Sequence, residues 1–122
     1  MRDYVYFIGF ADDADLNALY SEAACTSFVS LYEGFGFPVL ESMACGTPVV
    51  TSNVSSLPEV AGNVAPMVNP LDVEAMVAEF EKILSNPYYT DTLSKQGLQH
   101  VKQFTWERSA EHLLEVYHHL LS

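Results

Sequence analysis

Two glutamates and two glycines carry the strongest chemical signal in this 122-residue sequence. Glu33 and Glu41 bracket a segment that contains Gly34, Gly36 and, two residues after Gly36, Pro38. Glycine lacks a Cβ, so it lets backbone amides approach a ligand closely. Proline suits the first turn of a helix, whose free amides and dipole favour an anion such as a phosphate. A carboxylate accepts two hydroxyl hydrogen bonds at once, so the segment predicts a site for a sugar or ribose diol beside a phosphate.

Each of these features also has a simpler interpretation when it is taken alone. A Gly-x-Gly pair is often only a turn, Glu41 could simply favour the helix dipole, and Glu33 could be a solvated loop acid. The three features converge within one short segment, however, and this combination favours a binding site over three unrelated coincidences.

The elements around this loop alternate between strand and helix. Apolar runs predict strands at residues 5–8, 26–31, 48–52 and 64–68, the last of them edge-like because it contains a proline. Helical periodicity and capping residues predict helices that end near residue 24 and at residue 46, then helices at 73–84, 90–103 and from 106, with a helical turn or loop at 57–62. The order predicts an α/β fold: a Rossmann-like parallel sheet of about four strands with helices on both faces, closing in a helical segment. Glu33 should then lie past the carboxyl end of a strand, where open parallel sheets bind ligands.

Length and composition limit the classes of protein that remain. The 122 residues suit a single domain, and 49% hydrophobic residues suffice for a core. Five basic and 16 acidic residues give a net charge of −11, which makes nucleic acid and anionic membranes poor partners. No apolar run approaches the roughly 18 residues of a membrane span. Cys25 and Cys45 form no Cys-x-x-Cys pair and suit reduced thiols, so we expect a cytoplasmic protein.

Other reactive side chains offer weaker signals. The four histidines have no metal-ligand spacing and suit surface polar positions; they are His100, His112, His118 and His119. Cys45 has no histidine near it in the sequence, and the serines at 52–56 lack a Gly-x-Ser-x-Gly elbow, so a nucleophilic enzyme is disfavoured. We therefore expect no metal site.

The whole segment from Tyr32 to Val50 resembles the signature of the group-1, or family-4, glycosyltransferases, whose core is a Glu-x7-Glu motif. Here the motif is formed by Glu33 and Glu41. The resemblance covers nearly the whole chain, through further matching segments at residues 15–20, 57–62, 68–72 and 104–107.

The resemblance implies a fold and a reaction. Residues 1–122 would form a single, partial domain: the C-terminal nucleotide-sugar-binding domain of a retaining glycosyltransferase of the GT-B fold. Such an enzyme transfers a hexose to a glycan, lipid or small-molecule acceptor, as in polysaccharide biosynthesis. Its donor is a nucleotide-diphosphate sugar, and this fold class requires neither a metal nor another cofactor.

The resemblance also implies roles for individual residues. Glu33 matches the glutamate that faces the donor sugar at the reaction centre and is the candidate catalytic residue. Glu41 matches the glutamate that binds the ribose hydroxyls. Further donor contacts are implied for Gly34, Phe35, Gly36, Phe37 and, in the turn after the first expected strand, Phe10.

One feature needed for transfer is missing from this sequence. No lysine or arginine occurs between Asp3 and Glu81, although a leaving nucleoside diphosphate needs positive charge nearby. In the family the basic pair and the acceptor-binding N-terminal domain lie upstream of the matched segment, so we expect the 122 residues alone to be inactive. The alternative is a non-catalytic binding subunit of a split glycosyltransferase that acts with a separate partner chain. A sugar-nucleotide epimerase of similar fold is a third possibility, disfavoured because the Glu-x7-Glu pattern belongs to the transferases.

Overall fold

A three-stranded parallel sheet lies at the centre of the computed structural model, which describes residues 2–121. Its strands are β1 (Thr26–Phe28), β2 (Val49–Ser52) and β3 (Met67–Val68), in the order β1-β2-β3. Both pairs are parallel, with Ser27 opposite Val50 and Ser52 opposite Val68. The predicted parallel α/β fold is thereby confirmed.

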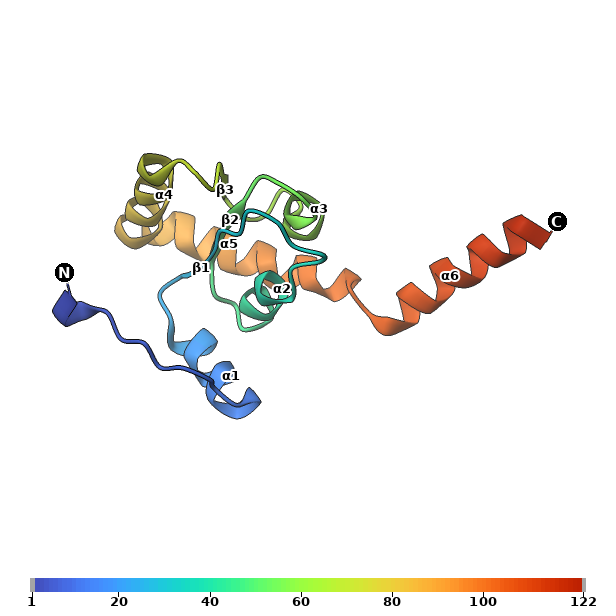
Figure 1. Ribbon diagram of the computed structural model, residues 1–122, viewed down its shortest axis with the longest axis horizontal. Coiled ribbons are helices and arrows are strands. Elements are labelled where there is room, and N and C mark those ends of the chain that lie inside the picture. The colour runs from blue at the N-terminus through green and yellow to red at the C-terminus, as the bar shows by residue number, and fades with distance from the viewer. Residues whose placement is uncertain (1, 122) are drawn as a thin grey trace.

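Within the described residues, six α-helices surround and extend this sheet (Figure 1). They are α1 (Asp13–Glu22), α2 (Phe37–Ala44), α3 (Leu57–Ala61), α4 (Val73–Ser85), α5 (Pro87–His100) and α6 (Trp106–Leu121), with 3-10 turns at Arg2–Tyr4 and Val101–Gln103.

Side-chain caps explain where three of the helices begin. Asp12 accepts a hydrogen bond from the Asp15 amide at 2.9 Å, and Asp72 caps α4 in the same way. Asn86 ends α4, as expected, but its side chain also accepts from the Tyr89 amide at 3.1 Å. Helix α5 therefore begins at Pro87, earlier than its periodicity predicts, because one asparagine serves both helix ends.

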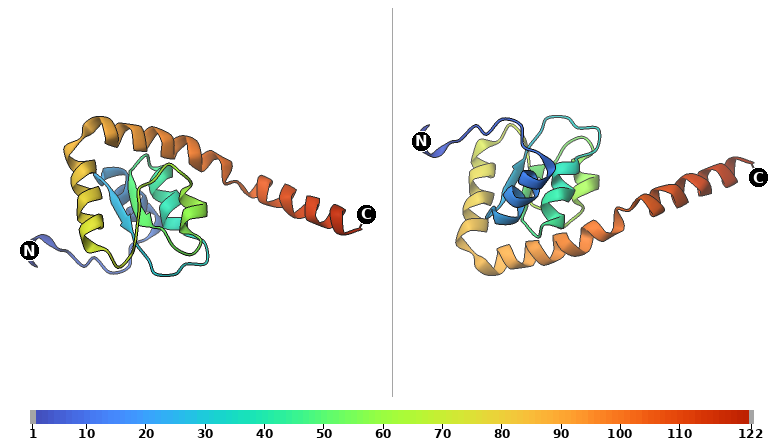
Figure 2. Two further views of the ribbon diagram at one scale, coloured as in Figure 1. Left: turned by 90° about the horizontal axis from the view of Figure 1, so that it is seen from above. Right: turned by 90° about the horizontal axis from the view of Figure 1, so that it is seen from below.

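Helices cover both faces of the sheet, as predicted (Figure 2). Val49 and Val50 are adjacent in β2, so their side chains point to opposite faces, and both are buried. Val49 belongs to a core cluster with residues of α2 and α3. Val50 packs instead with Ile83 of α4 and Leu93 of α5.

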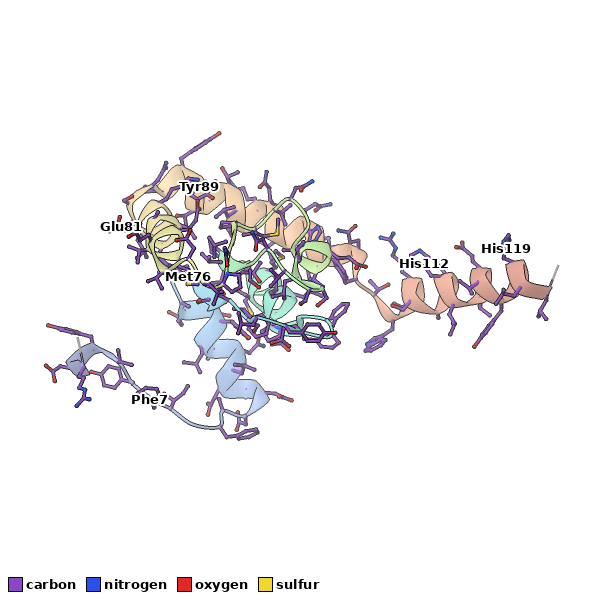
Figure 3. The ribbon with its side chains drawn as sticks, turned by 45° about the horizontal axis from the view of Figure 1, so that its top comes forward. Phe7, Met76, Glu81, Tyr89, His112 and His119 are labelled. Carbon is purple, nitrogen blue, oxygen red and sulfur yellow. The ribbon has the colours of Figure 1, made fainter. Side chains whose placement is uncertain are left out.

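The prediction of a strand at residues 5–8 is wrong. This stretch is extended but pairs with no strand of the described chain, and Tyr6 and Phe7 are 82% and 97% exposed. Figures 1 and 3 show it running away from the helices that cover the sheet, with Phe7 in the open. An apolar run becomes a buried strand only where it pairs with a sheet edge and is covered by another element. The sheet ends at β1 and β3, and residues 5–8 pair with neither of these edges in the described chain.

The C-terminal helix α6 also projects from the body of the molecule (Figure 1). All its described side chains are exposed. Its apolar face contains the residues expected from the periodicity: Trp106, Ala110, Leu113, Leu114, Tyr117, Leu120 and Leu121. The predicted closing helical segment is present. None of the helices within residues 2–121 is long and apolar enough to cross a membrane.

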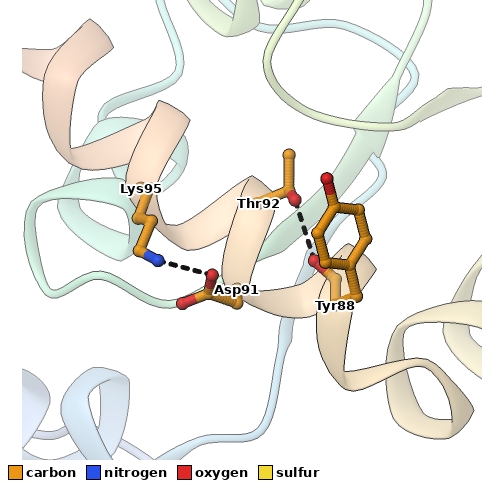
Figure 4. A network of polar contacts seen from close by, with 4 residues as sticks. All are labelled: Tyr88, Asp91, Thr92 and Lys95. Atoms are coloured by element: carbon orange, nitrogen blue, oxygen red, sulfur yellow. Dashed lines mark hydrogen bonds and ion pairs between the residues drawn. The ribbon is translucent and has the colours of Figure 1, made fainter.

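Helix α5 has polar side-chain interactions on its solvent-exposed side, and its last residue makes a hydrogen bond to α3. On its outer side Lys95 pairs with Asp91 at 2.6 Å, and the Thr92 hydroxyl donates to the Tyr88 carbonyl (Figure 4). Such exposed i,i+4 pairs contribute only a few tenths of a kcal/mol. At the end of the helix His100 is not a surface residue as predicted: it is partly buried, with its Nε2 2.9 Å from the Val60 carbonyl oxygen.

Candidate functional site

The loop from residue 29 to residue 36 leaves the carboxyl end of β1, so Glu33 lies where the sequence places it. Hydroxyl groups of β2 hold the start of this loop. The Thr51 hydroxyl donates to the Phe28 carbonyl at 2.9 Å, and the Ser52 hydroxyl donates to the Ser30 carbonyl at 2.6 Å. These two bonds tie the end of β1 and the start of the loop to β2.

Two serines before α3 hold the middle of the loop, a role that the sequence analysis missed. Ser55 Oγ accepts from the Glu33 amide at 3.0 Å. Ser56 Oγ lies 3.0 Å from the Glu33 carbonyl oxygen and 2.7 Å from that of Phe35. The available signal was the pair of serines directly before an expected helical turn, since serine hydroxyls readily bond to nearby backbone. They fix the backbone on both sides of Gly34 and so restrict where the Glu33 side chain can reach.

The two glycines of the loop differ in what the structure requires of them. Gly36 has φ of 121°, and a Cβ added there would lie 2.6 Å from Cδ2 of the fully buried Leu57. At Gly34 an added Cβ would meet nothing within 4 Å. Gly36 is therefore required by the packing of the chain itself, whereas a requirement at Gly34 would have to come from a ligand.

This difference predicts a large loss of stability at one glycine and almost none at the other for the same substitution. Gly36→Ala should lower the free energy of unfolding by about 1–3 kcal/mol, from the strained φ and the contact with Leu57. Gly34→Ala should change it by less than about 0.5 kcal/mol. Urea unfolding monitored by circular dichroism measures both, and an equal loss in the two variants would contradict this assignment.

Helix α2 presents its amino end to the same region. Its N-cap is Gly36, which has no side chain to accept from the first helical amides. Those amides and the helix dipole favour an anion at this end. Glu41 lies just beyond the first turn of α2.

The Glu41 carboxylate has a protein partner on α1. The Tyr20 hydroxyl donates to Glu41 Oε2 at 3.1 Å. Partial burial, together with this hydrogen bond and the nearby carboxylate, raises the pKa of Tyr20 to about 12. Tyr20 thus remains a hydrogen-bond donor at all physiological pH values.

A groove of about 610 Å³ is lined by some of the residues that the sequence predicts for the donor site. Phe35, Phe37 and Glu41 line it together with Phe104 and Trp106. The ring centroids of Phe35 and Phe37 are 4.7 Å apart, so the two side chains form one aromatic wall.

Other predicted residues lie elsewhere. Glu33, Gly34 and Gly36 are not among the residues that line this groove. Phe10 lines a separate groove beside α1, with Ala18 and Leu19, and is 96% exposed. The shared crevice for the two glutamates therefore stays a prediction.

Neither of these two grooves is lined by a lysine or an arginine. Lys82 and Lys95 pair with acids on α4 and α5. Within residues 2–121 no group of three or more His, Cys, Asp and Glu side chains could hold a metal ion.

Together these features define an α/β domain whose glycine-containing loop and helix amino end lie beyond the carboxyl edge of a parallel sheet. Comparison with known proteins identifies the family to which this domain belongs. Residues 1–100 match the family of glycosyl transferases group 1, and the chain belongs to that family. This confirms the resemblance found in the sequence.

Known relatives support the same assignment. The chain is 40% identical to O-antigen chain mannosyltransferase B of Escherichia coli, over 93% of this chain and 30% of the relative. It is 36% identical to the MMP alpha-(1->4)-mannosyltransferase of Mycolicibacterium hassiacum, over 96% of this chain and 29% of the relative. The solved structure of sucrose-phosphate synthase from Thermosynechococcus elongatus, a GT-B protein, matches 98% of the chain with a TM-score of 0.83 and 35% identity. The chain spans about 30% of the length of these relatives.

Proposed function

We propose that this chain binds the nucleotide-sugar donor of a retaining glycosyltransferase. Glu33 faces the donor sugar at the reaction centre, and Glu41 accepts hydrogen bonds from the ribose hydroxyls. The supporting observation is the combination of group 1 family membership with a glutamate, Glu41, beside the uncapped amino end of α2.

The geometry suits this division of roles. Amides at the start of α2 and in the preceding loop bind the diphosphate and the sugar hydroxyls, because they carry partial positive charge at a fixed position. The aromatic wall of Phe35 and Phe37 lines the same groove as Glu41 and gives that groove an apolar side. The charge of the leaving diphosphate requires basic residues from outside residues 3–81, which contain none.

The relatives suggest which sugar to test first. Both sequence relatives described above are named mannosyltransferases. We therefore propose a hexose as the transferred group, with a nucleoside-diphosphate mannose as the first donor to be assayed.

Removal of the Glu41 carboxylate tests donor binding. Glu41→Ala should weaken the binding of a nucleoside diphosphate at least tenfold, because each hydrogen bond to a charged group contributes about 1.5–3 kcal/mol. Titration of UDP, GDP and ADP into the ¹⁵N-labelled chain, followed by amide chemical shifts, measures affinities in the millimolar range.

Glu81→Ala is the matched control for this titration. Glu81 is an exposed residue of α4, so the variant loses the same charge at a distant position (Figure 3). It should bind as the unmodified chain does. Equal binding by Glu41→Ala and the unmodified chain would exclude Glu41 from the donor site.

A further inference from the structure

The hydrogen bond between Tyr20 and Glu41 joins two helices through side chains alone. The residues are 21 positions apart, one in α1 and the other in α2, and the Tyr20 hydroxyl lies 3.1 Å from Glu41 Oε2. Together with Asp13, Asn17 and Cys45 they line a small groove between the two helices, of about 270 Å³.

The backbone of Tyr20 is itself held in place. The Thr47 hydroxyl donates to the Tyr20 carbonyl at 2.6 Å, and the Cys45 thiol donates to the Asn17 side-chain oxygen at 3.2 Å. Ser42, which is fully buried, donates to the Thr47 carbonyl at 2.9 Å and so ties this turn back to α2. The backbone that carries the Tyr20 side chain is therefore held in place relative to α2.

A glutamate without a partner is poorly suited to bind a diol, because its side chain must lose rotamer freedom when the ligand binds. An ionised carboxylate offers about four acceptor positions. Tyr20 occupies one of them on Oε2, so Oε1 and the second position on Oε2 remain for two ribose hydroxyls.

We propose that Tyr20 is a positioning residue for the donor site: it holds the Glu41 carboxylate, before the ligand arrives, in the orientation that accepts the ribose diol. This inference rests on the proposed function, since it assigns the ribose to Glu41. The tyrosine hydroxyl does not touch the ligand. It acts by removing part of the conformational entropy that Glu41 would otherwise lose on binding.

The raised pKa of Tyr20 agrees with this role. Glu41 and Cys45 are the titratable groups that act on its hydroxyl, and Asp13 lines the same groove. Burial and the Glu41 carboxylate raise the pKa of Tyr20 to about 12 and so keep the hydroxyl protonated. The folded-state pKa lies above the ordinary value of 10.0, so this contribution to stability is complete below pH 10. It is lost as the pH rises through 12. Nucleotide affinity should therefore be independent of Tyr20 ionisation between pH 7 and pH 10.

Tyr20→Phe tests the proposal because it removes only the hydroxyl. In the amide-shift titration, we expect about three- to tenfold weaker binding of whichever ribonucleotide, UDP, GDP or ADP, binds the unmodified chain most tightly. This is the cost of immobilising one flexible side chain on binding. We expect no change for the 2′,3′-dideoxy analogue of that nucleotide, which has no diol for Glu41. Tyr20→Phe added to Glu41→Ala should cause no further loss.

The chain contains a matched control for this substitution. Tyr89 of α5 donates to Glu79 Oε2 of α4 at 3.2 Å, which is the same kind of helix–helix bond at a site away from the groove (Figure 3). Tyr89→Phe should leave the affinity for both nucleotides unchanged. If Tyr20→Phe weakens the dideoxy analogue as much as the ribonucleotide, the hydroxyl has only a structural role and the proposal is overturned.

The titrations separate this inference from the proposed function. Weakened binding by Glu41→Ala with normal binding by Tyr20→Phe overturns the positioning role alone. Normal binding by Glu41→Ala overturns the assignment of the ribose to Glu41, and the inference with it. Absence of shifts with every nucleotide overturns donor binding by this chain.

Discussion

The 122-residue chain, mixed with nucleotide sugars and simple acceptors, should show no sugar transfer and no donor hydrolysis above background. Two deficits support this expectation. Loss of two charge-assisted hydrogen bonds to the diphosphate costs about 3–6 kcal/mol, or roughly two to four decades of affinity. Loss of acceptor positioning can raise the barrier by about a further 7–11 kcal/mol. The net charge of −11 adds repulsion of an anionic donor.

A chimaera measures how large these deficits are. The chain replaces the matching segment of the Escherichia coli mannosyltransferase B, of which it covers 30%. Transfer by the chimaera should exceed that of the isolated chain by several orders of magnitude, as followed by release of the nucleoside diphosphate. Glu33→Ala in the chimaera is the control and should abolish the gain. Turnover by the isolated chain that disappears on Glu33→Ala would contradict the prediction.

Leu57→Ala should destabilise the domain severely. Leu57 is fully buried in the core cluster on the α2 and α3 face, beneath Gly36. Its truncation should cost about 2–5 kcal/mol, a large part of the roughly 5–15 kcal/mol that stabilises a small domain. Thermal and urea unfolding measure the loss. Leu71→Ala is the matched control: that leucine is 77% exposed, so the change should be within about 0.5 kcal/mol.

The double variant Gly36→Ala/Leu57→Ala adds a sharper test of how the loop packs. Leu57→Ala removes the Cδ2 atom that an alanine at position 36 would meet at 2.6 Å. The two losses should therefore sum to more than the loss in the double variant, with a coupling of about 0.5–3 kcal/mol. Strict additivity would show that the cost at position 36 comes only from its positive φ.

Several features of the fold followed from short-range patterns. Asp12 and Asp72 cap α1 and α4 by accepting from an amide only three residues later, so these helix starts depend on local sequence. Val49 and Val50 were recognisable as a buried strand, since a strand covered on both faces needs apolar residues at consecutive positions. The position of Glu33 after β1 followed from the order of strands and helices.

The site itself could be predicted only in part. The spacing of Glu33 and Glu41 predicted one glutamate in the loop and one in the helix, and both lie there. The hydrogen-bond partners of the two glutamates could not be predicted. The serine bonds to Glu33 join residues 22 and 23 positions apart, and the Tyr20 bond to Glu41 joins residues 21 positions apart. No periodicity encodes a contact between residues so far apart.

The sequence by itself determined the family, the parallel α/β fold and the approximate positions of most helices, because each depends on neighbouring residues or on a long specific motif. Only the tertiary structure decided which apolar residues are buried. Residues 5–8 and the apolar face of α6 have the composition of core segments, yet both are exposed in the described chain. It also decided that Gly36 is required by Leu57 and that Glu41 is held by Tyr20. Burial and side-chain partnership depend on what lies opposite in space, and local sequence does not specify that.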